Sequence, residues 1–172
     1  MHNFDFMLNF TPPHHGNSPE SYLDALYEAG CSDAVVGVGF RGMIGLDFTR
    51  PAESAEEALR SAIRNVQTAI PGATLVQAGP DLVGLTDMAD IFGFTRQNMR
   101  KYALSYGEGR EAFPLPTILG EPSLWHLAEI ASWLKMNTSV VQPADVLEIS
   151  KAAAMINHEI DSVRLKRILA LA

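Results

Sequence analysis

Apolar and polar residues alternate over the first ten positions of the chain. The apolar positions are Phe4, Phe6, Leu8 and Phe10, and polar residues such as Asp5 stand between them. Successive side chains of an extended strand point to opposite faces. This period of two therefore predicts a strand with one buried and one exposed face.

A helix is predicted after the loop of residues 11–17, which is rich in proline and glycine. Ser18-Pro19 has the features of an N-cap followed by proline in the first helical turn. We expect the apolar face of this helix to consist of Leu23, Leu26 and Tyr27. Gly30 is expected to end it, because glycine readily adopts the positive backbone angle of a helix C-terminus.

Two strands and a second helix follow. Residues 34–38 and 43–48 are predicted strands, joined by a hairpin turn at Gly39-Phe40-Arg41-Gly42. Ser54 and Glu57 form a capping box before a helix with apolar residues at helical spacing. These apolar residues are Leu59, Ile63, Val66 and Ile70.

Pro71-Gly72 ends the second helix, and residues 73–77 are a short predicted strand. The order is strand, helix, strand, strand, helix, strand. It predicts an α+β fold whose first domain is ferredoxin-like (βαββαβ), with two helices on one face of a sheet. A turn-rich segment at 77–81 separates it from a different pattern, so this domain is predicted to cover residues 1–79.

Two short helices with a tight turn are predicted between residues 86 and 106. Thr86 is the expected N-cap of the first helix, and Thr95 that of the second. Gly93 supplies the positive backbone angle of the turn, and the small Ala89 lets the helices approach. The expected inward residues are Met88, Ala89, Ile91 and Phe92 of the first helix and Met99, Tyr102 and Ala103 of the second. This pattern is typical of a helix-turn-helix.

If those residues point inward, the polar residues of the second helix point outward. They are Arg96, Gln97, Arg100 and Lys101, with Asn98 at the border. Arginine pairs with guanine, and glutamine or asparagine with adenine, while basic side chains also hold phosphates. The helix N-terminus near Thr95 adds its own attraction for phosphate. These residues, Thr95 included, are the predicted DNA-binding site.

Three motifs carry a resemblance to a known family. They are Leu82–Met99, then Phe113-Pro114-Leu115-Pro116, then the tryptophan-containing segment Leu124–Leu134. In order and spacing they resemble the excisionase-like winged helices of the MerR superfamily, over residues 82–135. The resemblance implies a winged helix-turn-helix domain at 80–136 that binds DNA, usually as a dimer. The family's wing often carries an arginine that contacts DNA. In this chain the wing turn Gly120-Glu121-Pro122 is acidic instead, so the sequence departs from the family at this point.

A long helix is predicted in the third part of the chain, residues 140–172, starting at Gln142-Pro143. Its apolar residues alternate in steps of three and four, which is a heptad seam. The seam consists of Val146, Ile149, Ala153, Ile156, Ile160 and Val163. Two interpretations stay open: a dimerisation helix, which suits a palindromic DNA site, and a helix packed on its own chain.

Composition limits the setting of the protein. Hydrophobic residues make up 47% and charged residues 19% of the chain, so a stable core is expected. No apolar run reaches the roughly 20 residues of a membrane span, and the N-terminus lacks a signal-peptide pattern. Cys31 is the only cysteine, so no internal disulfide forms. We expect a cytoplasmic protein without membrane contact.

The net charge of −7 is unevenly distributed. Residues 1–80 hold four arginines and nine acidic residues, a net of −5, whereas residues 81–172 hold nine basic and eleven acidic residues, a net of −2. Residues 95–110 hold four basic residues and only one acidic residue. A local basic patch of this kind can face DNA phosphates. The acidic first domain is expected to contact a protein partner, a ligand or a second copy.

No enzyme, cofactor or metal site is predicted, because no catalytic constellation is present. Adjacent histidines such as His14-His15 rarely bind one ion. The glycine-rich segment 37–42 precedes a strand rather than a helix, which favours a hairpin over a nucleotide-binding loop. Cys31 follows a helix end and is expected to be a buried, inert thiol.

The sequence thus predicts a transcription regulator that binds double-stranded DNA in the major groove as a homodimer. One alternative is an antitoxin-like module that neutralises a partner protein and represses its own operon. A second is a ligand-gated repressor. A third is a nucleic-acid enzyme or a recombination accessory protein that bends DNA.

Overall fold

The computed structural model describes residues 1–13, 19–38, 42–104 and 111–171. The predicted N-cap Ser18, the pair His14-His15 and most of the predicted hairpin turn lie outside these ranges. The chain forms two compact units: unit 1 is Met1–Gly79 with Ala152–Ala172, and unit 2 is Pro80–Lys151. The architecture is α+β, with a four-stranded antiparallel sheet, a two-stranded sheet and a long C-terminal helix.

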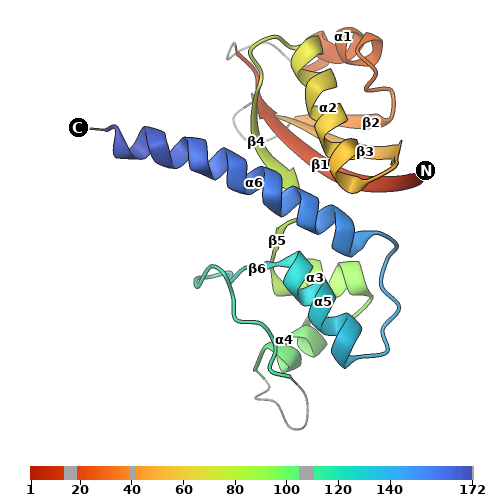
Figure 1. The fold of residues 1–172 in the computed structure, drawn as a ribbon, viewed down its shortest axis with the longest axis vertical. Helices are drawn as coiled ribbons and strands as arrows, with labels where there is room; N and C mark the ends of the chain where they lie inside the picture. The colour runs from red at the N-terminus through yellow and green to blue at the C-terminus, as the bar shows by residue number, and fades with distance from the viewer. Residues whose placement is uncertain (14–18, 39–41, 105–110, 172) are drawn as a thin grey trace. The chain divides into compact units, whose positions relative to one another are not determined.

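Unit 1 is built on a sheet with strand order β2-β3-β1-β4, in which all neighbouring strands are antiparallel. Its strands are β1 (His2–Thr11), β2 (Ala34–Val38), β3 (Ile44–Ala52) and β4 (Thr74–Gly79). The 3-10 turn η1 (Pro19–Tyr22) leads into α1 (Leu23–Glu28), and α2 (Ala55–Ala69) connects β3 to β4. Both helices cover the same face of the sheet (Figure 1).

The burial of β1 confirms the predicted half-buried strand. Phe4, Phe6, Leu8 and Phe10 are buried, and the residues between them are exposed or half-buried. Phe6 lies opposite Phe48 of β3, and their rings stack with 5.1 Å between centroids. One face of the sheet therefore packs under the helices, and the other stays open, as is common in antiparallel sheets.

The predicted apolar face of the first helix is wrong at two of its three positions. Leu26 is buried, but Leu23 and Tyr27 are 43% and 71% exposed. The α-helical part is only six residues long, so a single position reaches the core. The helix ends at the expected place, where Gly30 has a φ of +89°.

Ser54 caps α2 as predicted. Its hydroxyl accepts a hydrogen bond from the Glu57 N–H at 3.2 Å. The Glu57 carboxylate accepts from the N–H of Glu53 at 3.3 Å, one residue earlier than the expected capping box. Of the predicted apolar face, Leu59, Val66 and Ile70 are buried.

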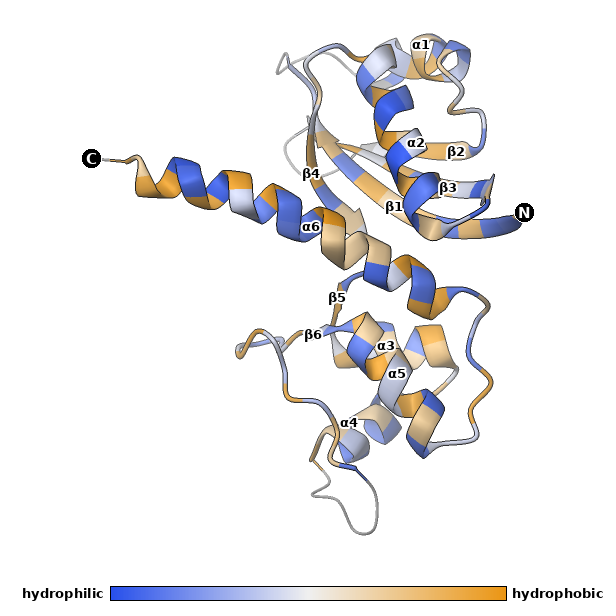
Figure 2. Ribbon diagram, viewed as in Figure 1, coloured by the Kyte–Doolittle hydropathy of each residue, from blue (hydrophilic) through white to orange (hydrophobic). Residues whose placement is uncertain are grey.

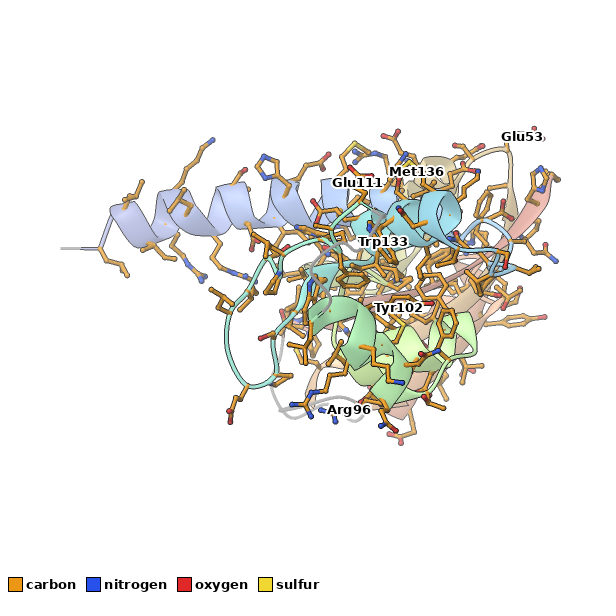
Figure 3. All side chains as sticks on the ribbon, turned by 90° about the horizontal axis from the view of Figure 1, so that it is seen from below. Glu53, Arg96, Tyr102, Glu111, Trp133 and Met136 are labelled. Carbon is orange, nitrogen blue, oxygen red and sulfur yellow. The ribbon has the colours of Figure 1, made fainter. Side chains whose placement is uncertain are left out.

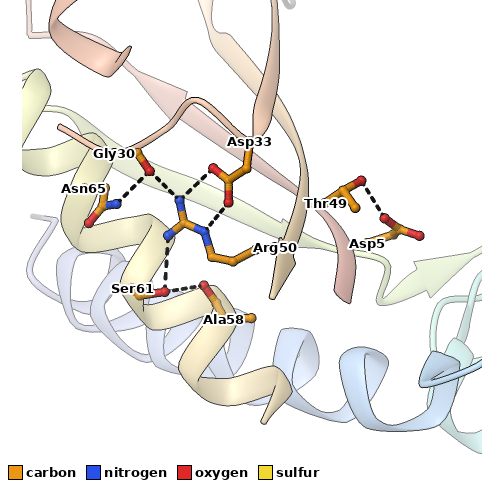
Figure 4. A network of polar contacts seen from close by, with 8 residues as sticks. All are labelled: Asp5, Gly30, Asp33, Thr49, Arg50, Ala58, Ser61 and Asn65. Carbon is orange, nitrogen blue, oxygen red and sulfur yellow. Dashed lines mark hydrogen bonds and ion pairs between the residues drawn. The ribbon is translucent and has the colours of Figure 1, made fainter. Parts of the chain in front are cut away.

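Arg50 of β3 is buried on the helix-covered face of the sheet, where it is 6% exposed. Its guanidinium donates two hydrogen bonds to the Asp33 carboxylate, at 2.7 and 2.9 Å. It also donates to the Gly30 carbonyl at 2.9 Å and to the Ser61 hydroxyl at 3.2 Å (Figure 4). A buried charge is costly unless it is paired, so this network fixes β3 to α2 and to the chain after α1.

Unit 2 gathers short helices and strands around its own core. They are β5 (Leu82–Val83), α3 (Leu85–Phe92), α4 (Arg96–Leu104), β6 (Trp125–His126) and α5 (Leu127–Asn137). β5 pairs antiparallel with β6. Fully buried core residues include Met88, Met99, Leu127 and Ile130.

The last helix, α6 (Val146–Leu169), starts a few residues after the expected Gln142-Pro143. The first four positions of the predicted seam, Val146, Ile149, Ala153 and Ile156, are buried within the chain itself. Val163, the last position, is 68% exposed. At the first four positions the seam therefore reflects packing on the protein's own core.

The end of the chain carries exposed aliphatic side chains. They are Val163, Leu165, Ile168, Leu169 and Leu171, each more than half exposed. Apolar and hydrophilic residues are mixed around this end of α6 (Figure 2). Within the part of the chain that the structure describes, no helix has both the length and the apolar character to cross a membrane.

Replacing Arg50 with alanine is expected to lower the free energy of unfolding by about 3 kcal/mol, because Asp33 would lose the partner of its partly buried charge. Urea denaturation followed by circular dichroism measures the change. Arg64→Ala is the matched control, since Arg64 is exposed on α2, and it should cost less than about 0.5 kcal/mol. Equal effects of the two substitutions would refute a structural role for the Arg50 network.

Candidate nucleic-acid interface

The first helix of the predicted pair, α3, is capped differently from the expectation. The prediction of Thr86 as N-cap is wrong, because the N-cap is Gly84. The Asp87 carboxylate accepts a hydrogen bond from the Gly84 N–H at 2.8 Å. This contact stabilises the helix start without a hydroxyl at the N-cap. Of the predicted inward residues, Met88, Ala89 and Phe92 are buried and Ile91 is partly buried.

Three residues, Gly93 to Thr95, reverse the chain between α3 and α4. Gly93 adopts the predicted left-handed conformation, with a φ of +69°. The Phe94 N–H then donates to the Ala89 carbonyl at 2.8 Å and closes the end of α3. The Thr95 hydroxyl accepts from the Asn98 N–H at 3.1 Å, which confirms Thr95 as the N-cap of α4.

Side chains on the inner face of α4 fix its rotation about its axis. Met99 is fully buried. Tyr102 contacts three aromatic rings at centroid distances between 5.4 and 6.5 Å, those of Phe94, Phe113 and Trp133. Aromatic pairs at these distances attract one another beyond the effect of burial. The opposite side of α4 must therefore face solvent.

The solvent side of α4 carries the predicted DNA-binding residues. Arg96, Gln97, Arg100 and Lys101 are exposed, Asn98 is half-buried, and Thr95 is exposed at the helix start. Residues four apart are neighbours on a helix, so Arg96 adjoins Arg100, and Gln97 adjoins Lys101. Figure 3 shows Arg96 at the outer side of unit 2, with Tyr102 and Trp133 toward its interior.

Two tryptophans hold residues 111–114 in place. The indole N–H of Trp133 donates to the Glu111 carbonyl, and that of Trp125 to the Pro114 carbonyl, each at 3.0 Å. Phe113 packs against both indoles, with centroid distances of 5.0 and 6.5 Å. Trp125 and Trp133 are therefore core residues, and they anchor residues 111–114 to β6 and α5.

The anchored segment leads into the loop that was predicted as the wing. Ile118 and Leu124 exchange two backbone hydrogen bonds, at 3.1 and 3.0 Å, across this loop. Leu124 directly precedes β6, which pairs with β5. The loop that contains Gly120-Glu121-Pro122 is thus connected to the small sheet of unit 2.

A hollow of about 880 Å³ lies between α4, the start of α3 and this loop. Arg96 and Arg100 line it from α4, Gly84–Asp87 from α3, and Gly120–Ser123 from the loop. The sequence did not reveal this hollow, because it arises where three separate segments meet. The lining contains two guanidinium groups, those of Arg96 and Arg100, and two carboxylates, those of Asp87 and Glu121.

Two other chemically versatile side chains belong neither to the exposed face of α4 nor to the lining of the hollow. His126 Nδ1 lies 2.6 Å from a carboxylate oxygen of the buried Asp81. Cys31 is buried, and this burial raises the pKa of its thiol, which disfavours the reactive thiolate. Among the described residues, no three His, Cys, Asp or Glu side chains are placed to hold a metal ion.

Comparison of the chain with protein-family models, with curated proteins and with solved structures gives no match. The residues of α4 and the hollow beside it are therefore the features from which a function can be inferred.

Met99→Asp is expected to unfold the α3–α4 region, because it would bury an unpaired charge. Amide NMR spectra would show lost dispersion for residues of unit 2. Met99→Leu, which keeps an apolar side chain of similar volume, should leave the spectra essentially unchanged. A well-folded Met99→Asp protein would show that the inner face of α4 is assigned wrongly.

Proposed function

We propose that the protein is a sequence-specific transcription regulator that binds double-stranded DNA through α4. The observation that carries this proposal is the exposed face formed by Arg96, Gln97, Arg100 and Lys101, set opposite the buried Met99. An α-helix fits the major groove of B-DNA, and these side-chain types recognise base edges and phosphates. The proposal involves no catalysis, cofactor or metal ion.

In this proposal unit 1 is a ferredoxin-like domain, and unit 2 is a winged helix-turn-helix. The element order β1-α1-β2-β3-α2-β4 and the sheet order β2-β3-β1-β4 support the first assignment. The second is supported by the three-residue turn between α3 and α4 and by the loop between Ile118 and Leu124. The resemblance of residues 82–135 to excisionase-like proteins agrees with it.

The two rows of side chains on α4 take different parts in recognition. Gln97 and Lys101 form the row away from the hollow, where Gln97 is suited to an adenine edge and Lys101 to a phosphate. Arg96 and Arg100 form the row beside the hollow, within reach of guanine edges or of a phosphate strand. Asn98 and the helix start at Thr95 add contacts at the N-terminal end of α4.

The hollow beside α4 suits a sugar–phosphate strand that leaves the major groove. Arg96 and Arg100 provide its positive charge. Asp87 at the start of α3 and Glu121 on the loop place negative charges in the lining, where they repel phosphate. We therefore expect α4, rather than the loop, to supply most of the binding energy.

The regulator is proposed to act as a homodimer in the cytoplasm. Two copies of α4 spaced by one DNA turn read a palindromic site together. The single buried cysteine is compatible with a reducing compartment.

A second candidate function is an antitoxin-like module, which binds a partner protein and also represses its own operon. It is favoured by the exposed aliphatic residues at the end of α6, from Val163 to Leu171. Exposed apolar patches of this kind often mark protein-binding surfaces. Both candidates use the same DNA-binding face of α4.

A salt titration tests the proposed function. The protein is expected to bind DNA from upstream of its own gene more tightly than a scrambled duplex, and its affinity should fall as salt rises. Fluorescence anisotropy with labelled duplexes measures both affinities. Equal affinity for the two duplexes at every salt concentration would contradict the proposal and leave partner binding as the better candidate.

Arg100→Ala and Gln97→Ala are each expected to weaken specific binding by about 1–3 kcal/mol without affecting folding, since both side chains are exposed. The same anisotropy assay measures the loss. Arg64→Ala, which removes an equal charge from α2, is the matched control for Arg100→Ala and should bind like the original protein. Unchanged binding by both α4 variants would show that this face of α4 does not recognise the DNA sequence.

A further inference from the structure

The two edge strands of the unit 1 sheet, β4 and β2, differ in whether their outward backbone groups are bonded. At the β4 edge, the side-chain amide of Asn157 bonds the backbone of Ala78 twice, as donor to its carbonyl and as acceptor from its N–H, both at 2.8 Å. Asn157 belongs to α6, so this helix occupies the place of a neighbouring strand. The β4 edge is therefore closed at Ala78.

At the other edge, β2 has a strand on one side only. The Thr49 N–H donates to the Asp33 carbonyl at 3.1 Å, just before β2 begins. In an antiparallel ladder such bonded pairs recur at every second residue, so Val35 and Gly37 also bond to β3. The N–H and C=O of Val36 consequently point away from β3. Within the described residues, no other strand pairs with this edge.

The sequence of β2 has none of the features that normally block pairing at an edge. Ala34–Val38 contains no charged residue and no proline, and its register with β3 runs without a bulge. The nearest carboxylate in sequence, that of Asp33, is neutralised by Arg50 at 2.7 Å. Two copies of this acidic domain can therefore pair along β2 without a charged side chain on either of the paired strands.

The strand is also complementary to itself. In an antiparallel pair centred on Val36, Val35 lies opposite Gly37 of the second copy. Val35 is 73% exposed, and the space around Gly37 is open on the side where a Cβ would be. A bulky residue thus meets a vacant position, and the symmetry of the pair repeats this contact.

We infer that β2 is the dimerisation element, and that it pairs antiparallel with β2 of a second copy of this chain. This inference rests on the proposed function in one respect, since a palindrome reader needs two copies. The predicted seam of α6 does not supply the contact at its first four positions, because these are buried within the chain.

The test compares Val36→Pro with Val36→Thr by sedimentation equilibrium over a range of protein concentrations, without DNA. Proline removes the outward N–H and leaves the ladder to β3 intact, whereas threonine keeps the N–H and the β-branched shape. The original protein and Val36→Thr are expected to have twice the chain mass, and Val36→Pro the single mass. A dimeric Val36→Pro protein, or a monomeric original protein at high concentration, overturns the inference.

Hydrogen exchange gives a second measurement that does not depend on whether Val36→Pro folds. The Val36 amide of the original protein should be protected, and this protection should weaken on dilution. Fast exchange at every concentration overturns the inference. Arg100→Ala separates this result from the proposed function: it should lose DNA affinity and remain a dimer. A dimer through β2 that binds no DNA would support the inference and contradict the proposed function.

Discussion

The position of α4 depends on the burial of Met99 and on the ring contacts of the partly buried Tyr102. Tyr102 lies among aromatic rings, and one of them, Trp133, is itself held by its bond to the Glu111 carbonyl. Because a helix is rigid, fixing two inner positions fixes every outer one. Rotation of α4 by one residue would turn a charged or polar side chain into this cluster, at a cost of a few kcal/mol. The polar face is thus set before any ligand arrives, which reduces the ordering cost of binding.

Charge pairing distinguishes Arg50 and Arg60 of unit 1 from the cations of α4. In unit 1, Arg50 is paired with Asp33, and Arg60 with Glu56 and Glu159, at 2.6 to 2.8 Å. The cations of α4, by contrast, form no ion pair with any carboxylate of the described residues. These cations are Arg96, Arg100 and Lys101. A protein with a net charge of −7 therefore keeps a small group of cations available for an anionic partner.

The sequence predicted those features that depend on local rules. The alternation of β1, the caps Ser54 and Thr95 and the turn at Gly93 each depend on a few neighbouring residues, and the structure confirms them. The apolar face of α1 and the N-cap of α3 were predicted wrongly. In α1 the helix was shorter than its apolar pattern, and in α3 a carboxylate replaced the expected hydroxyl. The hollow beside α4 was beyond prediction, because it forms where α4, the start of α3 and the loop of Gly120–Ser123 meet.

The α6 helix shows how one element can limit assembly as well as stabilise the fold. The apolar residues of its heptad pattern are buried within the chain up to Ile156. The next residue, Asn157, closes the β4 edge at Ala78. A sheet with two open edges can add copies without limit and form fibres. With β4 blocked at Ala78, pairing through β2 uses the open edge of each copy in one symmetric contact. Such a contact ends at two copies, because it is symmetric and uses the β2 edge of both.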